Sequence, residues 1–382
     1  MTKRRIDIFD TTLRDGEQGP GCLLTREAKL TIAEKLDLMG VQIIEAGFPI
    51  SSPADFKAVR EVSQIVKNAK VCALARARKL DIDTAADALK YAVSPRIQLG
   101  IGTSDIHIKH KFNTTRDKIL DMAFNMVKYA ANKTEEVQFF AEDAGRADNN
   151  FLAEMVQTVI DAGAKVVNIP DTNGFCTPFE YHEKIKFIID HVPNVHKAKI
   201  SVHCHNDLGM ATANTIAGLL AGAEQAEGTI NGVGERAGNA ALEEIISILM
   251  VKDLPVFADI NPVFIGELSK MVEKAMSSPI QANKAVVGKN AFAHSSGIHQ
   301  DGVLKNRANY EIIDPELVGI ELPDLILTSR SGRAALKNRL TALKIFYSEN
   351  EFEIYYERFL QLADTKSVVT EQELITLFGQ GK

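Results

Sequence analysis

Two histidines, His203 and His205, lie two positions apart at the end of an apolar run. Successive side chains of a β-strand point to opposite faces, so this spacing places both imidazoles on one face. Two converging imidazoles are suited to binding a divalent metal ion. Such a pair is weak evidence by itself, because one histidine can be buried core while the other is exposed. The choice between these interpretations depends on the strands and helices that position the pair and on which other side chains they bring close to it.

The first two thirds of the chain repeat a short β-rich run, a turn and an amphipathic helical stretch. Parallel strands joined by helices produce this alternation, and eight such units in about 250 residues fit a closed (β/α)8 barrel. An open doubly wound sheet is the alternative, but no Gly-x-Gly-x-x-Gly motif follows the first predicted strand. The predicted strands are 5–9, 42–46, 70–74, 96–101, 137–141, 166–169, 199–203 and 225–230, and the predicted helices are 26–39, 54–68, 81–91, 116–131, 150–162, 178–191, 211–221 and 240–250.

Polar and charged side chains follow nearly every predicted strand. Catalytic groups of (β/α)8 enzymes lie at the C-terminal ends of the strands. Arg14 and Asp15 follow the first strand, Glu45 interrupts the apolar second strand, and the histidine pair ends the seventh. The convergence of these groups favours a metal site over two unrelated histidines. Further candidates at strand ends are Arg76, Arg78, Thr103, Ser104, His107, Glu142, Asp143, Asp171, Thr172 and Asn173.

The residue types indicate which metals fit. Two neutral imidazoles, a carboxylate and an amide oxygen suit Zn²⁺, Mn²⁺, Co²⁺ or Mg²⁺. Cys204 points away from the pair, so a closed structural zinc site is not expected. We expect an open catalytic site, where a metal acts as a Lewis acid on a carbonyl oxygen. Arg14 beside it can polarise a ketone oxygen or bind a carboxylate.

The glycine-rich segment 231–239 follows the eighth predicted strand. Its backbone could cradle a phosphate group or form a tight turn. We favour the turn, because no other feature of the segment indicates phosphate binding.

Composition limits the class of protein. The 382 residues are 45% hydrophobic and 25% charged, with a net charge of -6. This mixture is typical of a globular protein, and the acidic balance argues against partners such as nucleic acid or a membrane surface. No apolar stretch reaches the ~18 residues of a membrane span. Four scattered cysteines and the lack of a secretory signal predict a reduced, cytoplasmic protein.

The repeating pattern changes after about residue 255. A predicted helix over 268–276 precedes a glycine- and histidine-rich segment, 288–302, and the tail from Gly332 is helical, most clearly over 349–363 and 371–378. We expect three parts. They are a catalytic barrel over 1–265, a linker subdomain over 266–325 that carries His299, and a helical subdomain over 326–382.

Six motifs together resemble the 2-isopropylmalate synthase family, one of the barrels that condense acetyl-CoA with a 2-oxo acid and that include homocitrate synthases. The resemblance covers nearly the whole chain, and the second and sixth motifs favour the isopropylmalate branch. The motifs are FDTTLRDGEQ at 9–18, IEAGFP at 44–49, IPDT at 169–172, VHCHNDLG at 202–209, NGVGERAGN at 231–239 and HSSGIHQDG at 294–302.

The resemblance implies roles for particular residues. Arg14 would stabilise the oxyanion formed when the ketone is attacked, and Thr172 would hold the substrate carboxylate. Glu142, His299 and Tyr310 would manage proton transfers at the acetyl group and in thioester hydrolysis. The divalent metal, which the 2-oxo acid would chelate, would be bound by Asp15, His203, His205 and Asn239.

The resemblance also implies an assembly and a reaction. The segment around His299 would reach the barrel of a second subunit, which implies a homodimer; without the resemblance, His299 is interpreted as a loop or helix-capping residue. The enolate of acetyl-CoA would attack 2-oxoisovalerate in a Claisen-type condensation. Thioester hydrolysis would then release CoA and 2-isopropylmalate, as the first step of leucine biosynthesis by an acyltransferase.

Three features depart from the family. Gln98 stands where a histidine is usual, and Phe140 stands where a serine is usual. Both could alter the pocket for the acceptor, which is the 2-oxo acid that the enolate attacks. Gln98 can form hydrogen bonds but cannot take a proton, and Phe140 could narrow the pocket. Many relatives also carry a C-terminal leucine-binding regulatory domain. We expect none within these 382 residues and hence no inhibition by leucine, whether the chain is shortened or the enzyme lacks feedback.

Three alternatives to the leading hypothesis remain. A related acyltransferase could use another 2-oxo acid, as homocitrate, citramalate or chain-elongating synthases do. A metal-dependent aldolase or lyase could cleave a 3-hydroxy acid on the same barrel, although it would not need the segment that carries His299. A non-enzymatic binding module is the least favoured alternative, because it would not need a metal centre surrounded by charged strand ends.

Overall fold

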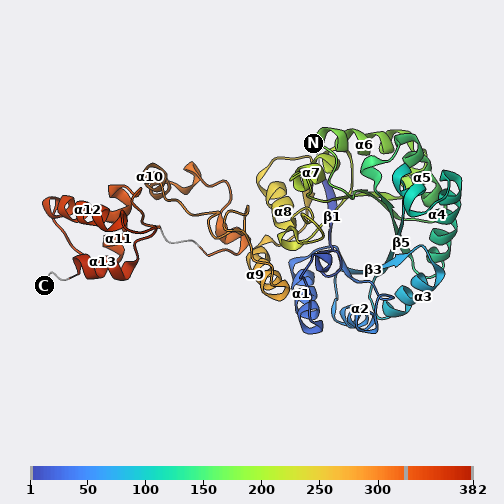
Figure 1. Ribbon diagram of the computed structural model, residues 1–382, viewed down its shortest axis with the longest axis horizontal. Helices are drawn as coiled ribbons and strands as arrows, with labels where there is room; N and C mark the ends of the chain where they lie inside the picture. The colour runs from blue at the N-terminus through green and yellow to red at the C-terminus, as the bar shows by residue number, and fades with distance from the viewer. Residues whose placement is uncertain (1–2, 322–325, 380–382) are drawn as a thin grey trace. The chain divides into compact units, whose positions relative to one another are not determined.

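The computed structural model describes residues 3–321 and 326–379, which form two compact units divided after Ile280. Parallel strands β1 to β8 of the first unit form a closed barrel (Figure 1), because β1 pairs with both β2 and β8. This closure excludes the open doubly wound sheet and confirms the predicted barrel. The strands are β1 (Arg4–Asp10), β2 (Ile43–Gly47), β3 (Lys70–Arg76), β4 (Pro95–Gly102), β5 (Glu136–Glu142), β6 (Val166–Asp171), β7 (Lys199–Cys204) and β8 (Gln225–Gly228).

Helices surround the barrel on its outer side (Figure 1). The helices are α1 (Arg26–Met39), α2 (Pro53–Ile65), α3 (Lys79–Ala88), α4 (Arg116–Ala131), α5 (Asn149–Asp161), α6 (Pro178–His191), α7 (Ala211–Ala221) and α8 (Leu242–Val251). Side-chain caps mark the starts of α1, α2, α5 and α6. For example, the Thr177 hydroxyl accepts a hydrogen bond from the Glu180 N–H, and the Glu180 carboxylate accepts from the Thr177 N–H.

The barrel strands are almost entirely buried, as is usual for parallel sheets with one face toward helices and the other toward the lumen. Every residue of β2 and β6 is buried. Residues that face the helices are aliphatic, such as Ile44 and Val202, whereas several lumen residues are polar. Polar side chains therefore occupy the lumen both at the C-terminal ends of the strands and deeper inside the barrel.

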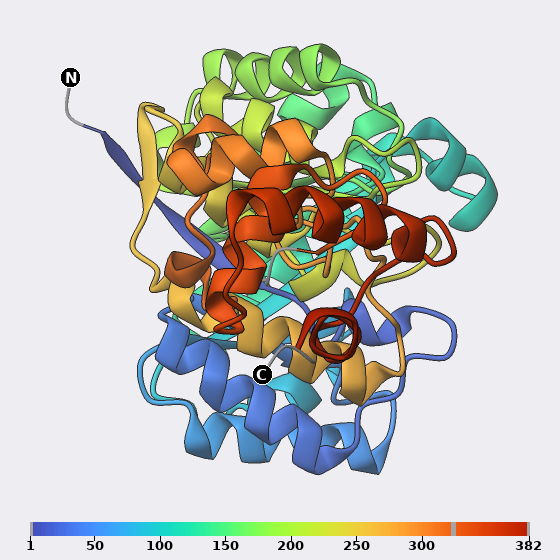
Figure 2. The same ribbon diagram turned by 90° about the vertical axis from the view of Figure 1, so that its left-hand side faces the viewer.

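The second unit is a small helical assembly, coloured orange to red in Figure 2. Its hydrophobic core includes Leu336, Phe352, Phe359 and Leu374, all fully buried. Its helices are α10 (Gly297–Lys305), α11 (Arg333–Ala342), α12 (Glu349–Ala363) and α13 (Glu371–Phe378). An isolated antiparallel bridge pairs Leu327, which precedes α11, with Val369, which precedes α13.

The unit boundary lies later than the expected one at residue 265. Helix α9 (Ile265–Met276) belongs to the first unit because it packs on α1 and on the turn over 230–232. The expected division between 325 and 326 borders residues 322–325, which lie outside the described residues. The short strand β9 (Val256–Ala258), which pairs with the start of β1, was not predicted.

Among the described residues, no helix combines the length and the apolar character required to cross a membrane.

Candidate metal centre

The turn after β1 presents Arg14 and Asp15 at the end of the barrel. Asp10, the last residue of the strand, accepts hydrogen bonds from the backbone N–H and the hydroxyl of Thr12, at 3.0 and 2.8 Å. The N–H groups of Arg14 and Asp15 both donate to the carbonyl of Thr11. This compact turn fixes the direction of both side chains.

The histidine pair lies at the end of β7, where the sequence predicts it. The rings of His203 and His205 face the same side, with centroids 5.0 Å apart. Backbone hydrogen bonds join the end of β7 to the loop that follows β8. They run from Asn206 N–H to Gly238 O and from Ala240 N–H to Cys204 O, each 2.9 Å. An isolated bridge pairs His205 with Asn239. The loop 231–239 is thus a tight turn held against the histidines.

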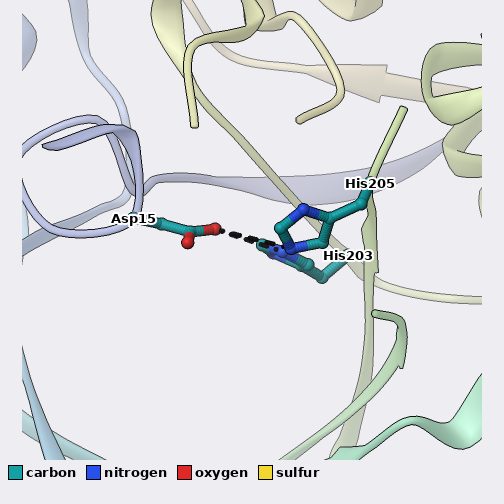
Figure 3. A group of neighbouring side chains, drawn as sticks. All are labelled: Asp15, His203 and His205. Carbon is teal, nitrogen blue, oxygen red and sulfur yellow. Dashed lines mark ion pairs between the residues drawn. The ribbon is translucent and has the colours of Figure 1, made fainter. Parts of the chain in front are cut away.

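Asp15 points toward both histidines (Figure 3). Its Oδ2 atom lies 3.3 Å from Nε2 of His203 and 3.9 Å from Nε2 of His205. One ligand atom from each of the three residues lies within 4.8 Å of the others. Ligand atoms bonded to one tetrahedral zinc ion at about 2.0–2.1 Å lie about 3.3 Å apart. The Asp15–His203 distance equals this spacing and the Asp15–His205 distance is somewhat longer, so the three residues are close enough to share one metal ion.

Asn239 offers an amide oxygen next to His205. Its side chain is 3% exposed, and its Nδ2 donates to the carbonyl of Val233 at 3.0 Å. Its Oδ1 is buried without a hydrogen-bond partner, as is Oδ2 of Asp15. Buried oxygens are rarely left without a partner. A divalent cation would satisfy both atoms, so the residues present fit the metal that the sequence implies.

The electrostatics of the cluster favour a cation. Burial would raise the pKa of the Asp15 carboxyl, but Arg14 and both histidines hold this pKa well below its usual range. Burial would lower the pKa of His203, but the neighbouring carboxylates of Asp15 and Glu227 raise it to about 9. Burial and the charge of His203 lower the pKa of His205 to about 4. In the absence of metal, the His203 ring is protonated and carries a positive charge. A bound metal ion would take the place of a ring proton and supply positive charge in its stead.

Arg14 is held between two carboxylates. Its Nε lies 2.7 Å from Oε1 of Glu45, and its guanidinium contacts Asp15 at 3.2 Å. Burial would lower the pKa of Arg14, but these carboxylates raise it. Burial raises the pKa of Glu45 to about 7, although Arg14 opposes this shift. The guanidinium is therefore charged and fixed beside the metal cluster.

A cavity of about 170 Å³ lies over the cluster. Gln98 reaches it from β4, donates a hydrogen bond to Glu45, and accepts one from Gln138 at 3.0 Å. Its amide is therefore fixed in one orientation. Predicted site residues that line this cavity are Arg14, Asp15, Gln98, Phe140, Glu142, Thr172, His203 and His205.

Phe140 projects from β5 into the same cavity and pairs in register with Gly100 of β4. A β-carbon on residue 100 would lie 2.3 Å from the ring of Phe140 and 2.4 Å from its carbonyl oxygen. Glycine at position 100 thus permits the ring to lie across the neighbouring strand. The aromatic ring therefore forms part of the cavity wall, and its effect on substrate choice stays a prediction.

Glu142, the last residue of β5, and Thr172, which directly follows β6, both lie on the cavity wall. The Glu142 carboxylate is paired with Lys111 Nζ, at 2.6 and 2.8 Å. Lys111 belongs to a π-helical turn over His107–Lys111, which the sequence did not predict; such turns are frequent at functional sites. The Thr172 hydroxyl accepts from the Asp143 N–H at 2.9 Å, so its own hydrogen is available to donate.

His299 and Tyr310 lie in the second unit. His299 is on α10, where no helix was predicted, and its ring is 4.4 Å from that of Tyr310. His294 lies close to both rings and contacts the Glu311 carboxylate at 3.0 Å. These residues form a cluster of their own, and their approach to a metal centre remains a prediction.

Several residues of the site were missed from the sequence. Gln18, Asn168, Glu227 and Arg236 also line the cavity. Glu227 could have been found by the argument that identified Glu45, because both are acids within buried strands. Gln18 ends a three-residue 3-10 helix and Arg236 lies on a loop, and in such short segments sequence periodicity does not show which side chains turn inward.

Comparisons with known proteins show the family of the chain. A family model described as HMGL-like matches residues 5–272, and one described as homocitrate synthase post-HMGL domain-like matches residues 286–367. A 2-isopropylmalate synthase of Parabacteroides distasonis is 54% identical over 99% of this chain and 76% of its own length. One from Bacillus velezensis is 50% identical over 99% of this chain and 74% of its own length.

Solved structures share the barrel at low sequence identity. A hydroxymethylglutaryl-CoA lyase from Pseudomonas aeruginosa matches 73% of this chain and 95% of its own, with a TM-score of 0.62 and 17% identity. The HMG-CoA lyase of Bacillus subtilis matches 73% of this chain and 97% of its own, with a TM-score of 0.61 and 18% identity. These likenesses concern the fold.

Proposed function

The chain belongs to the HMGL-like family and, within it, to the 2-isopropylmalate synthases, and from this premise we propose that it condenses acetyl-CoA with 2-oxoisovalerate. The enolate of the acetyl group attacks the ketone, and hydrolysis of the thioester releases CoA and 2-isopropylmalate. The enzyme is an acyltransferase of leucine biosynthesis. The observation that carries the proposal is the meeting of Arg14 and the Asp15–His203–His205 cluster at one cavity.

Four residues would bind the metal, namely Asp15, His203, His205 and Asn239. A divalent metal bound there, Mn²⁺, Zn²⁺ or Mg²⁺, would supply Lewis-acid polarisation of the acceptor ketone. The unpartnered oxygens of Asp15 and Asn239 support this assignment.

Arg14 would stabilise the oxygen that becomes negative as the ketone is attacked. Its ion pairs with Glu45 and Asp15 fix the guanidinium before substrate binds. A charged donor that needs no rearrangement is effective for this purpose. Thr172, whose hydroxyl hydrogen is free to donate, would bind the acceptor carboxylate.

Glu142 would transfer protons at the acetyl group together with His299 and Tyr310. Its position on the cavity wall supports this role. We also propose that the enzyme is a homodimer in which His299 and Tyr310 serve the barrel of the second subunit. Its four cysteines are free, which is consistent with a reducing cytoplasm.

Gln98 and Phe140 would select the acceptor. The ring of Phe140 narrows the cavity, which favours the short branched side chain of 2-oxoisovalerate over the longer side chain of 2-oxoglutarate. A synthase that uses another 2-oxo acid is the alternative within this class. A lyase is less well supported, because the lyases that resemble this chain are under 20% identical, whereas synthases are about 50% identical.

A thiol-release assay tests the proposal. Purified protein is supplied with Mn²⁺, acetyl-CoA and, separately, pyruvate, 2-oxobutyrate, 2-oxoisovalerate, 2-oxoisocaproate or 2-oxoglutarate. We expect 2-oxoisovalerate to give the highest kcat/KM. A higher value with another acceptor would reassign the substrate within the class, and the absence of CoA release with every acceptor would refute the proposal.

A further inference from the structure

Glu227 is a buried acid that the proposed reaction does not use. It lies in β8, pairs in register with His203 of β7 and with Phe9 of β1, and is 2% exposed. Burying a carboxylate in a barrel lumen is costly unless its oxygens are fully engaged. The contacts of its two oxygens therefore indicate its role.

One oxygen of Glu227 is saturated by donors. Oε1 accepts hydrogen bonds from Oγ of Ser201 and Nε2 of Gln138, each at 2.7 Å, and from Nε2 of Gln225 at 3.2 Å. These three donors fix the plane of the carboxylate. As a result, the second oxygen, Oε2, is directed at His203 and lies 3.5 Å from its Nδ1.

The His203 ring thus has a carboxylate at each nitrogen. Nδ1 faces Glu227, and Nε2 faces Asp15 at 3.3 Å on the side of the metal cluster. A neutral imidazole carries its hydrogen on only one nitrogen, so the acceptor on one side determines which nitrogen can bind a metal. At 3.5 Å the contact between Glu227 and Nδ1 of His203 is an ion-pair contact longer than an ordinary N–H···O hydrogen bond, so Nδ1 has no hydrogen-bond partner in the part of the chain that the structure describes.

We propose that Glu227 is a positioning residue of the metal centre, which keeps the hydrogen of His203 on Nδ1 and leaves Nε2 free to bind the cation. Carboxylates in this position orient histidine ligands and strengthen their binding of metals. The inference rests on the metal centre of the proposed function, but not on the acceptor. Nδ1 of both histidines is buried without a hydrogen-bond partner, but only Nδ1 of His203 has a carboxylate ion-pair contact among the described residues, from Glu227.

The structure distinguishes this role from a general effect of charge. In Glu227→Gln, the amide oxygen must remain with the three donors that surround Oε1. The amide NH₂ then faces Nδ1 of His203 and donates to it, which places the ring hydrogen on Nε2 and blocks the metal-binding nitrogen. A matched control is Glu136→Gln, which also removes one negative charge. Glu136 is the first residue of β5, at the end of the barrel away from the metal cluster, where it pairs with Lys70 and Arg96.

The test is the affinity for Zn²⁺, measured by competition with a chelating dye in the absence of substrates. We expect Glu227→Gln to bind Zn²⁺ about 10–100-fold more weakly than the parent and Glu136→Gln to stay within about twofold. Equal affinities for all three proteins, or equal losses in both variants, would overturn the role of Glu227. Failure of the parent to bind Zn²⁺ would overturn the metal centre as well.

A second measurement needs no variant. In the Zn²⁺-loaded parent labelled with ¹⁵N-histidine, nitrogen NMR shifts identify which ring nitrogen of His203 is protonated. We expect Nδ1–H with Nε2 bound to zinc. The reverse assignment would overturn the proposal even if the thiol-release assay confirms the condensing activity, so the two conclusions can fail separately.

Discussion

The ring of Phe140 lies across the backbone of Gly100, on the strand next to its own, and a β-carbon on Gly100 would come within 2.3 Å of the ring. The two residues pair in register on β4 and β5. The ring therefore lines the cavity over the metal cluster. It is the most direct structural reason to expect that only 2-oxo acids with short side chains are accepted.

Replacing Phe140 with serine enlarges the cavity, so acceptors with longer side chains should fit. We expect Phe140→Ser to raise kcat/KM for 2-oxoisocaproate relative to 2-oxoisovalerate by roughly tenfold or more, since one methylene is worth about 10–200-fold in a pocket. Phe179→Ser is the control, because Phe179 is 75% exposed on α6. An unchanged ratio in Phe140→Ser would show that the ring does not limit the acceptor.

Lys111 holds the Glu142 carboxylate through two short contacts. We expect Glu142→Gln to reduce kcat by about 10²-fold or more, the usual contribution of a general acid or base. Lys111→Gln should cause a smaller loss, roughly tenfold, because the carboxylate remains but is less well oriented. Steady-state kinetics check both values.

Lys109, which lies exposed on the same π-helical turn, supplies the control for Lys111. Lys109→Gln should change kcat by less than about twofold. Equal losses in the two lysine variants would point to the net charge of the turn rather than to the ion pair with Glu142.

The stability of the metal-free protein should fall as the pH rises above neutrality. Burial would lower the pKa of His203, but Asp15 and Glu227 raise it from 6.5 to about 9. The protonated ring therefore stabilises the fold fully below about pH 6.5, and this contribution is lost as the pH rises through about 9. Thermal unfolding between about pH 7.5 and 9.5 lies above the pKa of Asp10 and Glu45, each about 7. Burial also raises the pKa of the Cys72, Cys176 and Cys204 thiols, which lowers stability over the same interval. The contribution of His203 is therefore the difference between the parent and a variant that lacks this ring.

The same unfolding series on His203→Gln provides the comparison. The glutamine does not titrate, so its Tm should vary less over this pH interval than that of the parent. Parallel curves for the two proteins would contradict the raised pKa of His203.

The proposed exchange of residues between subunits predicts complementation. His203→Ala and His299→Ala should each be inactive, the former with reduced metal content and the latter with normal metal content. If His299 serves the barrel of the second subunit, refolding the two variants together should restore activity, because mixed dimers contain one intact site. Mixed dimers that form but stay inactive would contradict exchange between subunits.

The barrel was predictable because the alternation of strands and helices is strong along the first two thirds of the chain. The convergence of Asp15, His203 and His205 followed from the rule that strand ends meet at one rim. Glu227 could have been noted as an acid in a buried strand, but its role could not be predicted, because it depends on which oxygen its neighbours occupy, and Ser201 and Gln138 reach it only in the folded lumen. Helix α10 was missed because Gly297 and Gly302 lower its helix propensity.

Metal dependence of the condensation tests the central claim most directly. Protein depleted of metal with a chelator is assayed for CoA release with acetyl-CoA and 2-oxoisovalerate, before and after Mn²⁺ is added, and the product is identified by mass spectrometry. We predict no release without metal, and release with formation of 2-isopropylmalate after Mn²⁺ is restored. Condensation at the same rate in the depleted protein, or no condensation product after metal is restored, would contradict the account.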